Sequence, residues 1–186
     1  RELVYRKRQL TLAELVETLR SDWEGAEDLR RLVLNQSPAY GNDDQAADQM
    51  MKRLYDDYTQ LVWETPERNG VLRPCGISTF GREIAWAYPQ GNRMASPDGH
   101  HRGEILATNF SPSPGTDREG PTGVIKSYCK MDLTKVPSGA TIELKLDPGS
   151  LRGEAGVEAL VGLLRSFIDL GGFYMQIDAV DRETLL

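Results

Sequence analysis

The stretch from residue 141 to residue 180 constrains the fold of this chain most, because it has the pattern of a strand, a helix and a second strand. Apolar and polar residues alternate along 141–147 and again along 173–180, as in β-strands with one apolar face. Between them, residues 153–170 carry apolar side chains at helical spacing, and Gly171 and Gly172 supply the stop. We therefore predict a right-handed βαβ unit with parallel strands and their apolar faces against the helix.

The other face of both predicted strands is polar, with Glu143 and Lys145 on the first strand and Gln176 and Asp178 on the second. Strands of fully covered parallel sheets are usually apolar on both faces, so this polar face needs a destination. Two interpretations stay open. The face lines a barrel interior that holds a polar ligand, or it meets solvent or another part of a larger protein.

Residues 1–65 are predicted to be helical. Thr11 and Glu14 form a capping box before one helix, a second spans about 26–34, and Asp43 or Asp44 caps a third that reaches about Trp63. Further on, 76–88 is predicted to contain a strand, and Pro121 favours a helix over 122–130. Apolar spacing predicts these buried side chains for the third helix and for the 153–170 helix: Ala47, Met51, Leu54, Tyr58, Leu61 and Val62; and Val157, Leu160, Val161, Leu164, Phe167 and Ile168.

Charge and hydropathy exclude several classes of function. With 22 basic and 28 acidic residues the net charge is −6, which disfavours binding to a nucleic acid backbone. No apolar run approaches the ~18 residues that span a bilayer, and no signal peptide pattern is present, so we expect a cytoplasmic protein without membrane insertion. The chain opens without methionine and stops where a helix should begin, so we expect an internal segment of a longer protein.

Few residues suggest chemistry by themselves. Cys75 and Cys129 lack a neighbouring base in the sequence, and we interpret both as structural. His100 and His101 are adjacent in a loop, and a metal site there would need ligands from elsewhere, so no metal site is predicted. Composition and periodicity alone therefore indicate an α/β segment and no catalytic residue.

Three separated blocks of sequence are more specific. They are residues 38–44 (PAYGNDD), residues 95–132 with ASPDGHHRGE, SPSPGTDREGPT and KMD, and residues 169–185 with DLGG and VDRETL. Together they resemble the pyruvate formate-lyase-like domain of glycyl radical enzymes, in the same order and over nearly the whole chain. The resemblance implies an α/β fold, as one segment of a ten-stranded barrel with helices at its N-terminal end. Residues 1–186 would form a single incomplete segment, helical over 1–65 and strand and helix over 66–186.

The same resemblance implies a function. Glycyl radical enzymes carry a glycyl radical that a separate S-adenosylmethionine-dependent activase installs, and they act in a secluded pocket on a small-molecule substrate. The Y-G-N-D-D block favours a carbon-heteroatom lyase or dehydratase. The alternatives are a pyruvate formate-lyase-like acyltransferase, a radical decarboxylase, a synthase that forms carbon-carbon bonds, or a non-catalytic partner-binding fragment. A full-length member would be a homodimer, with the activase and the rest of its own barrel as partners.

Departures from the family pattern limit the site. The thiyl cysteine of the family stands in G-C-x-E-P and the radical glycine in R-V-x-G-[YF], and neither string occurs in these 186 residues. We therefore expect no catalytic residue in the chain and no activity from the chain alone. The resemblance implies substrate contacts at Gln90, Asn92 and Arg93, and the polar strand face adds Gln176. Residues 107–109 read A-T-N where the family often has A-D-G, and His100 stands where many members have arginine, so the substrate is not transferred from a relative.

Overall fold

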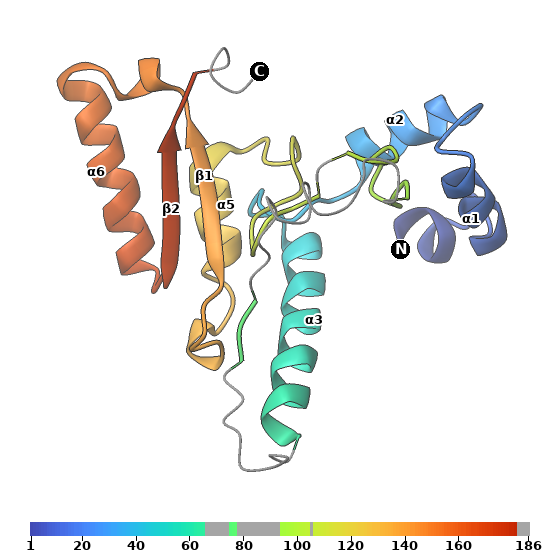
Figure 1. Ribbon diagram of the computed structural model, residues 1–186, viewed down its shortest axis with the longest axis horizontal. Helices are drawn as coiled ribbons and strands as arrows, with labels where there is room; N and C mark the ends of the chain where they lie inside the picture. Colours follow the sequence, from blue (N-terminus) through green and yellow to red (C-terminus); the bar gives the residue numbers. More distant parts are fainter. Residues whose placement is uncertain (66–74, 78–93, 105, 182–186) are drawn as a thin grey trace. The chain divides into compact units, whose positions relative to one another are not determined.

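The computed structural model describes residues 1–65, 75–77, 94–104 and 106–181 (Figure 1). The chain divides into two compact units. The first comprises residues 1–38 and 81–106, and the second comprises residues 39–80 and 107–186. Each unit has its own buried apolar cluster, so each is described by itself.

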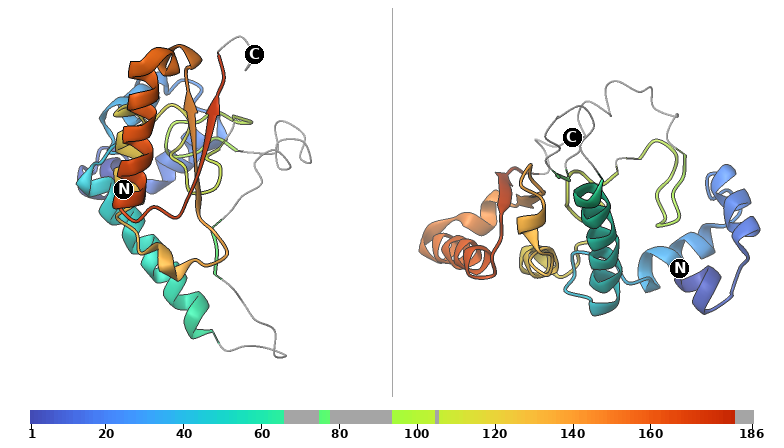
Figure 2. Two further views of the ribbon diagram at one scale, coloured as in Figure 1. Left: turned by 90° about the vertical axis from the view of Figure 1, so that its left-hand side faces the viewer. Right: turned by 90° about the horizontal axis from the view of Figure 1, so that it is seen from below.

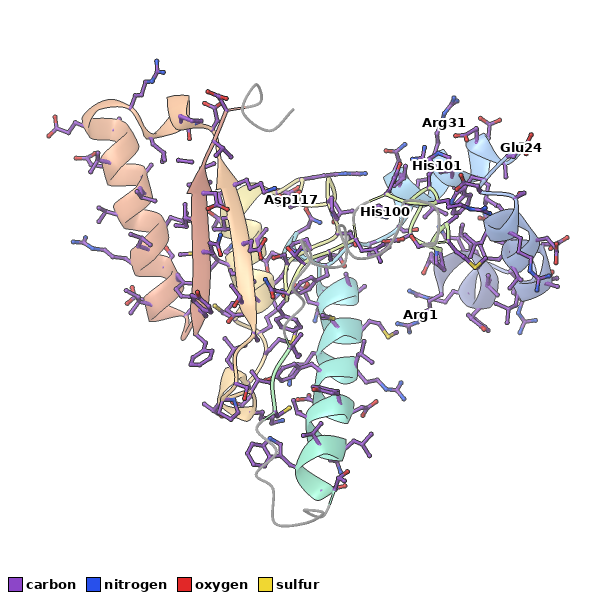
Figure 3. The ribbon with its side chains drawn as sticks, in the orientation of Figure 1. Arg1, Glu24, Arg31, His100, His101 and Asp117 are labelled. Carbon is purple, nitrogen blue, oxygen red and sulfur yellow. The ribbon has the colours of Figure 1, made fainter. Side chains whose placement is uncertain are left out.

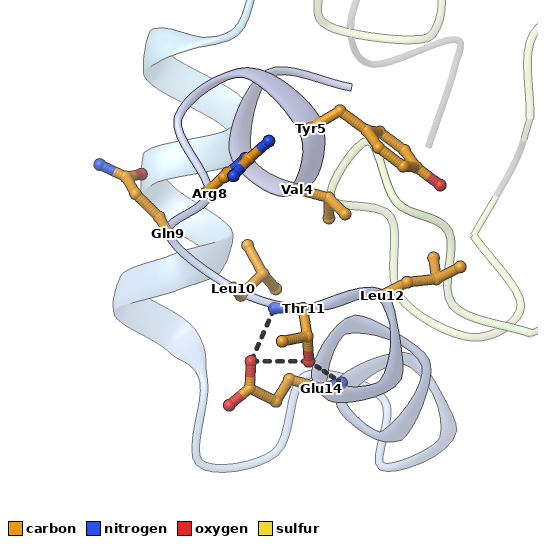
Figure 4. A pocket seen from close by; sticks show the side chains of 8 residues that line it. All are labelled: Val4, Tyr5, Arg8, Gln9, Leu10, Thr11, Leu12 and Glu14. Carbon is orange, nitrogen blue, oxygen red and sulfur yellow. Dashed lines mark hydrogen bonds between the residues drawn. The ribbon is translucent and has the colours of Figure 1, made fainter.

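The described part of the first unit consists of helical elements within residues 1–38 and the loop 94–104. It contains the π-helical turn η1 (Glu2–Arg6), α1 (Leu12–Arg20) and α2 (Glu27–Gln36). The predicted capping box is confirmed: the Glu14 amide donates to Thr11 Oγ1 at 3.2 Å, and the Thr11 amide donates to the Glu14 carboxylate at 2.7 Å (Figure 4). The Trp23 indole is fully buried and donates to the His100 carbonyl at 3.2 Å, which ties residues 94–104 to the helices.

The second unit combines helices with a parallel sheet. Its elements are α3 (Gln45–Glu64), α5 (Gly120–Tyr128), η2 (Leu133–Lys135), β1 (Thr141–Leu146), η3 (Pro148–Leu151), α6 (Gly153–Asp169) and β2 (Tyr174–Ala179). β1 and β2 are parallel neighbours in a register that runs from Thr141 opposite Tyr174 to Leu146 opposite Ala179. This confirms the predicted strand–helix–strand unit. Ile77 adds a parallel bridge to Ala140, and the rest of the strand predicted over 76–88 lies outside the described residues.

The helices α5 and α6 lie on the same side of the two strands (Figure 2). The apolar strand face that they cover includes Ile142, fully buried, and Leu144, 4% exposed. The Phe167 ring of α6 stacks on the Tyr128 ring of α5, with 6.0 Å between centroids and 7° between planes. Gly172 makes this packing possible, because a Cβ atom there would lie 2.3 Å from the Phe167 ring. The apolar core of this unit therefore lies between the strands and these two helices.

Two predicted helix faces are partly wrong. In α3, Leu54 and Leu61 are 64% and 67% exposed, and the buried side chains are Asp48, Tyr55 and Thr59. The helix turns Asp48 inward because Lys130 and Ser127 bind its carboxylate. An ion pair from a distant segment thus overrides the apolar pattern of the helix.

The helix α6 shows the same effect with apolar side chains alone. Val157 and Ile168 are 56% and 71% exposed, Val161 and Leu164 are each 39% exposed, and Phe167 is buried as predicted. The apolar arc of α6 is wider than the surface that the two strands and α5 offer, so only the part around Phe167 is covered. In the described part of the chain, no helix is both long and apolar enough to cross a membrane.

Candidate functional site

The polar face of the β1–β2 sheet is the first candidate site. The register places Glu143 opposite Gln176 and Lys145 opposite Asp178, so the four polar side chains form one patch. Glu143 and Asp178 are half-buried, while Lys145 and Gln176 are exposed. Gln176 Nε2 donates to the two Asp178 carboxylate oxygens at 3.3 and 3.2 Å. The patch therefore offers an amide, two carboxylates and an ammonium group. Of these, Lys145 and Asp178 are the next-to-last residues of β1 and β2, and ligands of open α/β sheets commonly bind at the carboxyl ends of the strands.

The loop 107–111 contacts this patch through Glu143. Thr108 Oγ1 donates to Glu143 Oε2 at 2.8 Å, and Asn109 Nδ2 donates to Glu143 Oε1. The Glu143 amide donates to Ser111 Oγ at 2.9 Å. Sequence reasoning named Glu143 but missed the two loop side chains that bind its carboxylate. The departure from A-D-G at residues 107–109 was the only signal for them.

The predicted substrate contacts are placed only in part. Gln176 lies on the polar face of β2, as predicted, and its side chain is exposed. Gln90, Asn92 and Arg93 lie outside the described residues. Their nearness to Gln176 therefore stays a prediction.

The Y-G-N-D-D block joins two other segments of the second unit. Tyr40 Oη donates to the Phe110 carbonyl at 3.3 Å. Gly41 has φ of +96°, and a Cβ atom there would lie 2.2 Å from Pro112 Cγ. Asn42 donates to the Thr116 carbonyl at 2.6 Å and accepts from the amide of residue 119 at 3.1 Å. The block thus joins the SPSPGTDREGPT segment to the start of α3.

Asp43 and Asp48, which flank the start of α3, both bind Lys130. Lys130 Nζ lies 2.6 Å from Asp43 Oδ1 and 2.6 Å from Asp48 Oδ2. Ser127 Oγ donates to Asp48 at 3.0 Å and accepts from the Asp43 amide at 2.9 Å. The hydrogen bond from Lys130 lowers the pKa of Asp43. Burial opposes the charged form of Lys130, but its bonds to the two carboxylates outweigh burial and raise its pKa.

The histidines belong to the first unit (Figure 3), and the buried His100 Nδ1 has a carboxylate oxygen nearby but no hydrogen-bond partner among the described residues. His100 is 7% exposed and its Nδ1 lies 3.2 Å from Asp98 Oδ1. His101 Nδ1 lies 3.1 Å from the Asp22 carbonyl. Among the residues that the structure describes, no group of three or more His, Cys, Asp or Glu side chains is arranged to hold a metal ion.

The cysteines do not fit the radical role. Cys75 is 1% exposed within the core, and burial raises the pKa of Cys129 to about 11. Neither follows the G-C-x-E-P pattern, and R-V-x-G-[YF] is absent from the 186 residues, so no reaction step is assigned to these side chains. An open groove is lined by side chains from η1, the segment 8–11 and the start of α1 (Figure 4): Val4, Tyr5, Arg8, Gln9, Leu10, Thr11, Leu12 and Glu14.

Comparison with known proteins assigns both parts of the chain to one enzyme class. The pyruvate formate lyase-like family matches residues 1–85, and the glycine radical family matches residues 106–186. Relatives with matching sequences are named as dehydratases and sulfite-lyases, and some as decarboxylases.

Individual relatives match over nearly the whole chain. The trans-4-hydroxy-L-proline dehydratase of Clostridioides difficile is 31% identical over 98% of this chain and 23% of its own length. The indoleacetate decarboxylase of Tractidigestivibacter scatoligenes is 33% identical over 84% of this chain and 17% of its own length. The B12-independent glycerol dehydratase of Clostridium butyricum, solved with glycerol bound, has a TM-score of 0.86 at 29% identity, over 99% of this chain and 23% of that one.

The chain therefore spans about a quarter or less of the length of the relatives named above. Its described part is a mixed α/β segment that superposes on part of those enzymes, and two family matches cover 1–85 and 106–186. From its sequence motifs, its fold and these matches, the chain belongs to the glycyl radical enzyme family.

Proposed function

We propose that these residues form part of a glycyl radical lyase of the dehydratase type, which cleaves a carbon-heteroatom bond in a small polar substrate. The observation that carries the proposal is the match to a dehydratase over 98% of the chain. The two family matches, over residues 1–85 and 106–186, support it. The Y-G-N-D-D block supports this branch over an acyltransferase of the pyruvate formate-lyase kind.

The polar sheet face supports a polar substrate. In a closed barrel this face would point into the lumen, because side chains of a strand alternate and the apolar face already packs on α5 and α6. A radical intermediate needs a pocket that excludes oxygen and stray hydrogen donors, and a barrel lumen is such a pocket. Gln176 would then bind substrate together with Gln90, Asn92 and Arg93. The forked guanidinium of Arg93 suits a carboxylate, sulfonate or hydroxyl oxygen.

Several further features belong to the same proposal. Residues 1–186 form one incomplete segment of a ten-stranded barrel, helical over 1–65 and strand and helix over 66–186. The whole enzyme is a cytoplasmic homodimer, and a separate S-adenosylmethionine-dependent activase installs its glycyl radical. The thiyl cysteine and the radical glycine stand in parts of the enzyme other than these 186 residues.

A second candidate is a radical decarboxylase. The 33% identity to the indoleacetate decarboxylase favours it, although that match covers less of the chain than the dehydratase match does. The two reactions differ in product, because a dehydratase releases water and leaves a carbonyl compound or an alkene, while a decarboxylase releases carbon dioxide.

The test uses the full-length enzyme, activated without oxygen by its activase. We expect turnover of a vicinal diol or a hydroxylated amino acid with loss of water, and no carbon dioxide from arylacetates. Release of carbon dioxide without dehydration would replace the proposal by the second candidate. The 186-residue chain, treated in the same way, should show no glycyl doublet in its electron paramagnetic resonance spectrum.

The role of Gln176 has its own test in the activated enzyme. We expect Gln176→Leu to lower kcat/KM about tenfold, the size of one lost hydrogen bond to a polar substrate, with a change in Tm of less than about 2 °C. Gln49→Leu changes an exposed glutamine of α3 and is the matched control. A large fall in Tm with unchanged kinetics would show that the polar face is structural.

A further inference from the structure

The backbone of Asn109, in the loop 107–111, has a conformation that few side chains adopt. Asn109 has φ of +50°, in the left-handed region that most side chains avoid and that Gly and Asn adopt most readily. Asn109 adopts this backbone geometry and also carries a side-chain amide group that glycine lacks.

The side-chain amide of Asn109 binds the carboxylate of Glu143. Its Nδ2 donates to one oxygen of Glu143, and Thr108 Oγ1 donates to the other at 2.8 Å. Both oxygens of a half-buried carboxylate are therefore satisfied by the loop. Hydrogen bonds to an ionised acceptor are stronger than bonds between neutral groups, so this contact outweighs an ordinary loop contact.

Phe110, the next residue, anchors the loop in the apolar core. Phe110 is 2% exposed, its amide donates to the Thr141 carbonyl at 2.8 Å, and its ring packs against Tyr40, Tyr55 and Tyr128 at centroid distances of 5.7 to 5.8 Å. Residues 108 and 109 thus face Glu143 while residue 110 enters the core. The loop is fixed on both sides of the first strand.

The charge at this contact comes from the strand. Thr108 and Asn109 are neutral, and the carboxylate that they bind belongs to Glu143 on β1. We propose that Thr108, Asn109 and Glu143 act as one positioning unit. This unit holds the 107–111 loop beside Glu143 on the polar face of the sheet. If the proposed function holds, this unit sets the space that remains for substrate beside Gln176.

Hydrogen exchange of the Phe110 amide tests the positioning unit without any assay of activity. We expect Glu143→Leu to lower the protection of this amide at least about tenfold, because the loop loses two charge-assisted bonds. Glu143→Gln keeps an acceptor for Asn109 and should lose less. Lys145→Leu, two residues along the same strand face and exposed, is the matched control and should leave the amide unchanged. Equal losses of protection from Glu143→Leu and Lys145→Leu, or no loss from Glu143→Leu, would overturn the unit.

A pair of variants at residue 109 separates backbone from side chain. Asn109→Gly keeps the left-handed geometry and loses only the amide bond, so the protection of Phe110 should fall by about threefold to tenfold. Asn109→Ala loses the bond and also strains the backbone, so its protection should fall further. Equal protection in these two variants would show that the φ of residue 109 has no part in holding the loop.

The substrate part of the inference rests on the proposed function and is tested in the activated full-length enzyme. We expect Glu143→Gln to raise KM about threefold to tenfold while kcat changes less than about twofold, because a shifted loop alters substrate binding before chemistry. Unchanged KM together with lost amide protection would show a purely structural loop. An enzyme with no dehydration activity would refute the proposed function, and the exchange measurements would still decide the positioning unit.

Discussion

In the second unit, the strand–helix–strand segment and the segments 39–48 and 107–130 differ in the contacts that hold them. Residues 141–179 pack through apolar side chains such as Ile142, Leu144 and Phe167, which repeat with the period of their own strand or helix. Residues 39–48 and 107–130 also contribute to the apolar core, for example through Phe110, but they depend in addition on polar contacts between positions 70 to 84 residues apart, such as Asn42 with Thr116 and Asp43 with Ser127. Local periodicity therefore predicts the first region, whereas the second depends on partners which no local pattern reveals.

The largest effect is expected from a variant in the apolar core of the strand–helix–strand segment. Phe167→Ala removes a buried ring that stacks on Tyr128, so we expect it to lower the free energy of unfolding by about 3–5 kcal/mol. Ile168→Ala, next to it on α6 and 71% exposed, should cost less than about 1 kcal/mol. Urea denaturation of both variants measures the difference. Similar losses would mean that the outer side of α6 is covered in solution.

The next largest effect is expected at Gly41, where the backbone lies closest to Pro112. Gly41→Ala combines a positive φ with a Cβ atom placed against Pro112, so we expect a loss of about 3 kcal/mol. Gly115→Ala also has a positive φ, of +77°, but its Cβ atom meets no atom within 4 Å, and it should cost about 1 kcal/mol. Thermal unfolding of the pair separates crowding from backbone strain. A Gly115 variant as unstable as the Gly41 variant would leave no role for the Pro112 contact.

A third variant sharpens the comparison at the shared lysine. Lys130→Met leaves the buried Asp48 carboxylate with Ser127 as its remaining partner, and we expect a loss of about 2 kcal/mol, since Lys130 itself is partly exposed to solvent. Lys126→Met removes only an exposed ion pair with Asp43 and should cost less than about 1 kcal/mol. The measurement is chemical denaturation of both variants. A cost at Lys126 as large as that at Lys130 would mean that burial of Asp48 has no special weight.

The smallest effect depends on pH. The pKa of Asp43 is lowered by Lys130, so Asp43 stabilises the folded state fully above its ordinary pKa of about 4, and this contribution disappears as pH falls through the lower folded value. Asp43→Asn should therefore be less stable than the unchanged chain at pH 7, and the difference in Tm should vanish towards pH 2. The pKa values of Asp22 and Asp56 are lowered as well, so both proteins lose stability in acid. A difference that stays constant with pH would mean that Asp43 acts through its shape alone.

The sequence by itself predicted several elements whose signal is local. The capping box at Thr11, the helix after Pro121 and the parallel pair β1–β2 follow from spacing, and the structure confirms each. Of the two candidate caps of α3, Asp43 and Asp44, the structure selects Asp44. The family was also evident from three blocks of sequence, and the two family matches agree with that prediction. Gln176 was placed on the polar face for the same local reason, the period of two along a strand.

Only the tertiary structure decided which side of α3 and α6 is buried and how the 107–111 loop is held. Leu54 and Val157 repeat at helical spacing but remain exposed, while Asp48 is buried because Lys130 and Ser127 reach it from 79 or more residues away. A wide apolar arc can be buried on several sides, so its period does not select one. The bond between Asn109 and Glu143 joins two segments with no shared pattern, and only folding brings them within hydrogen-bond distance.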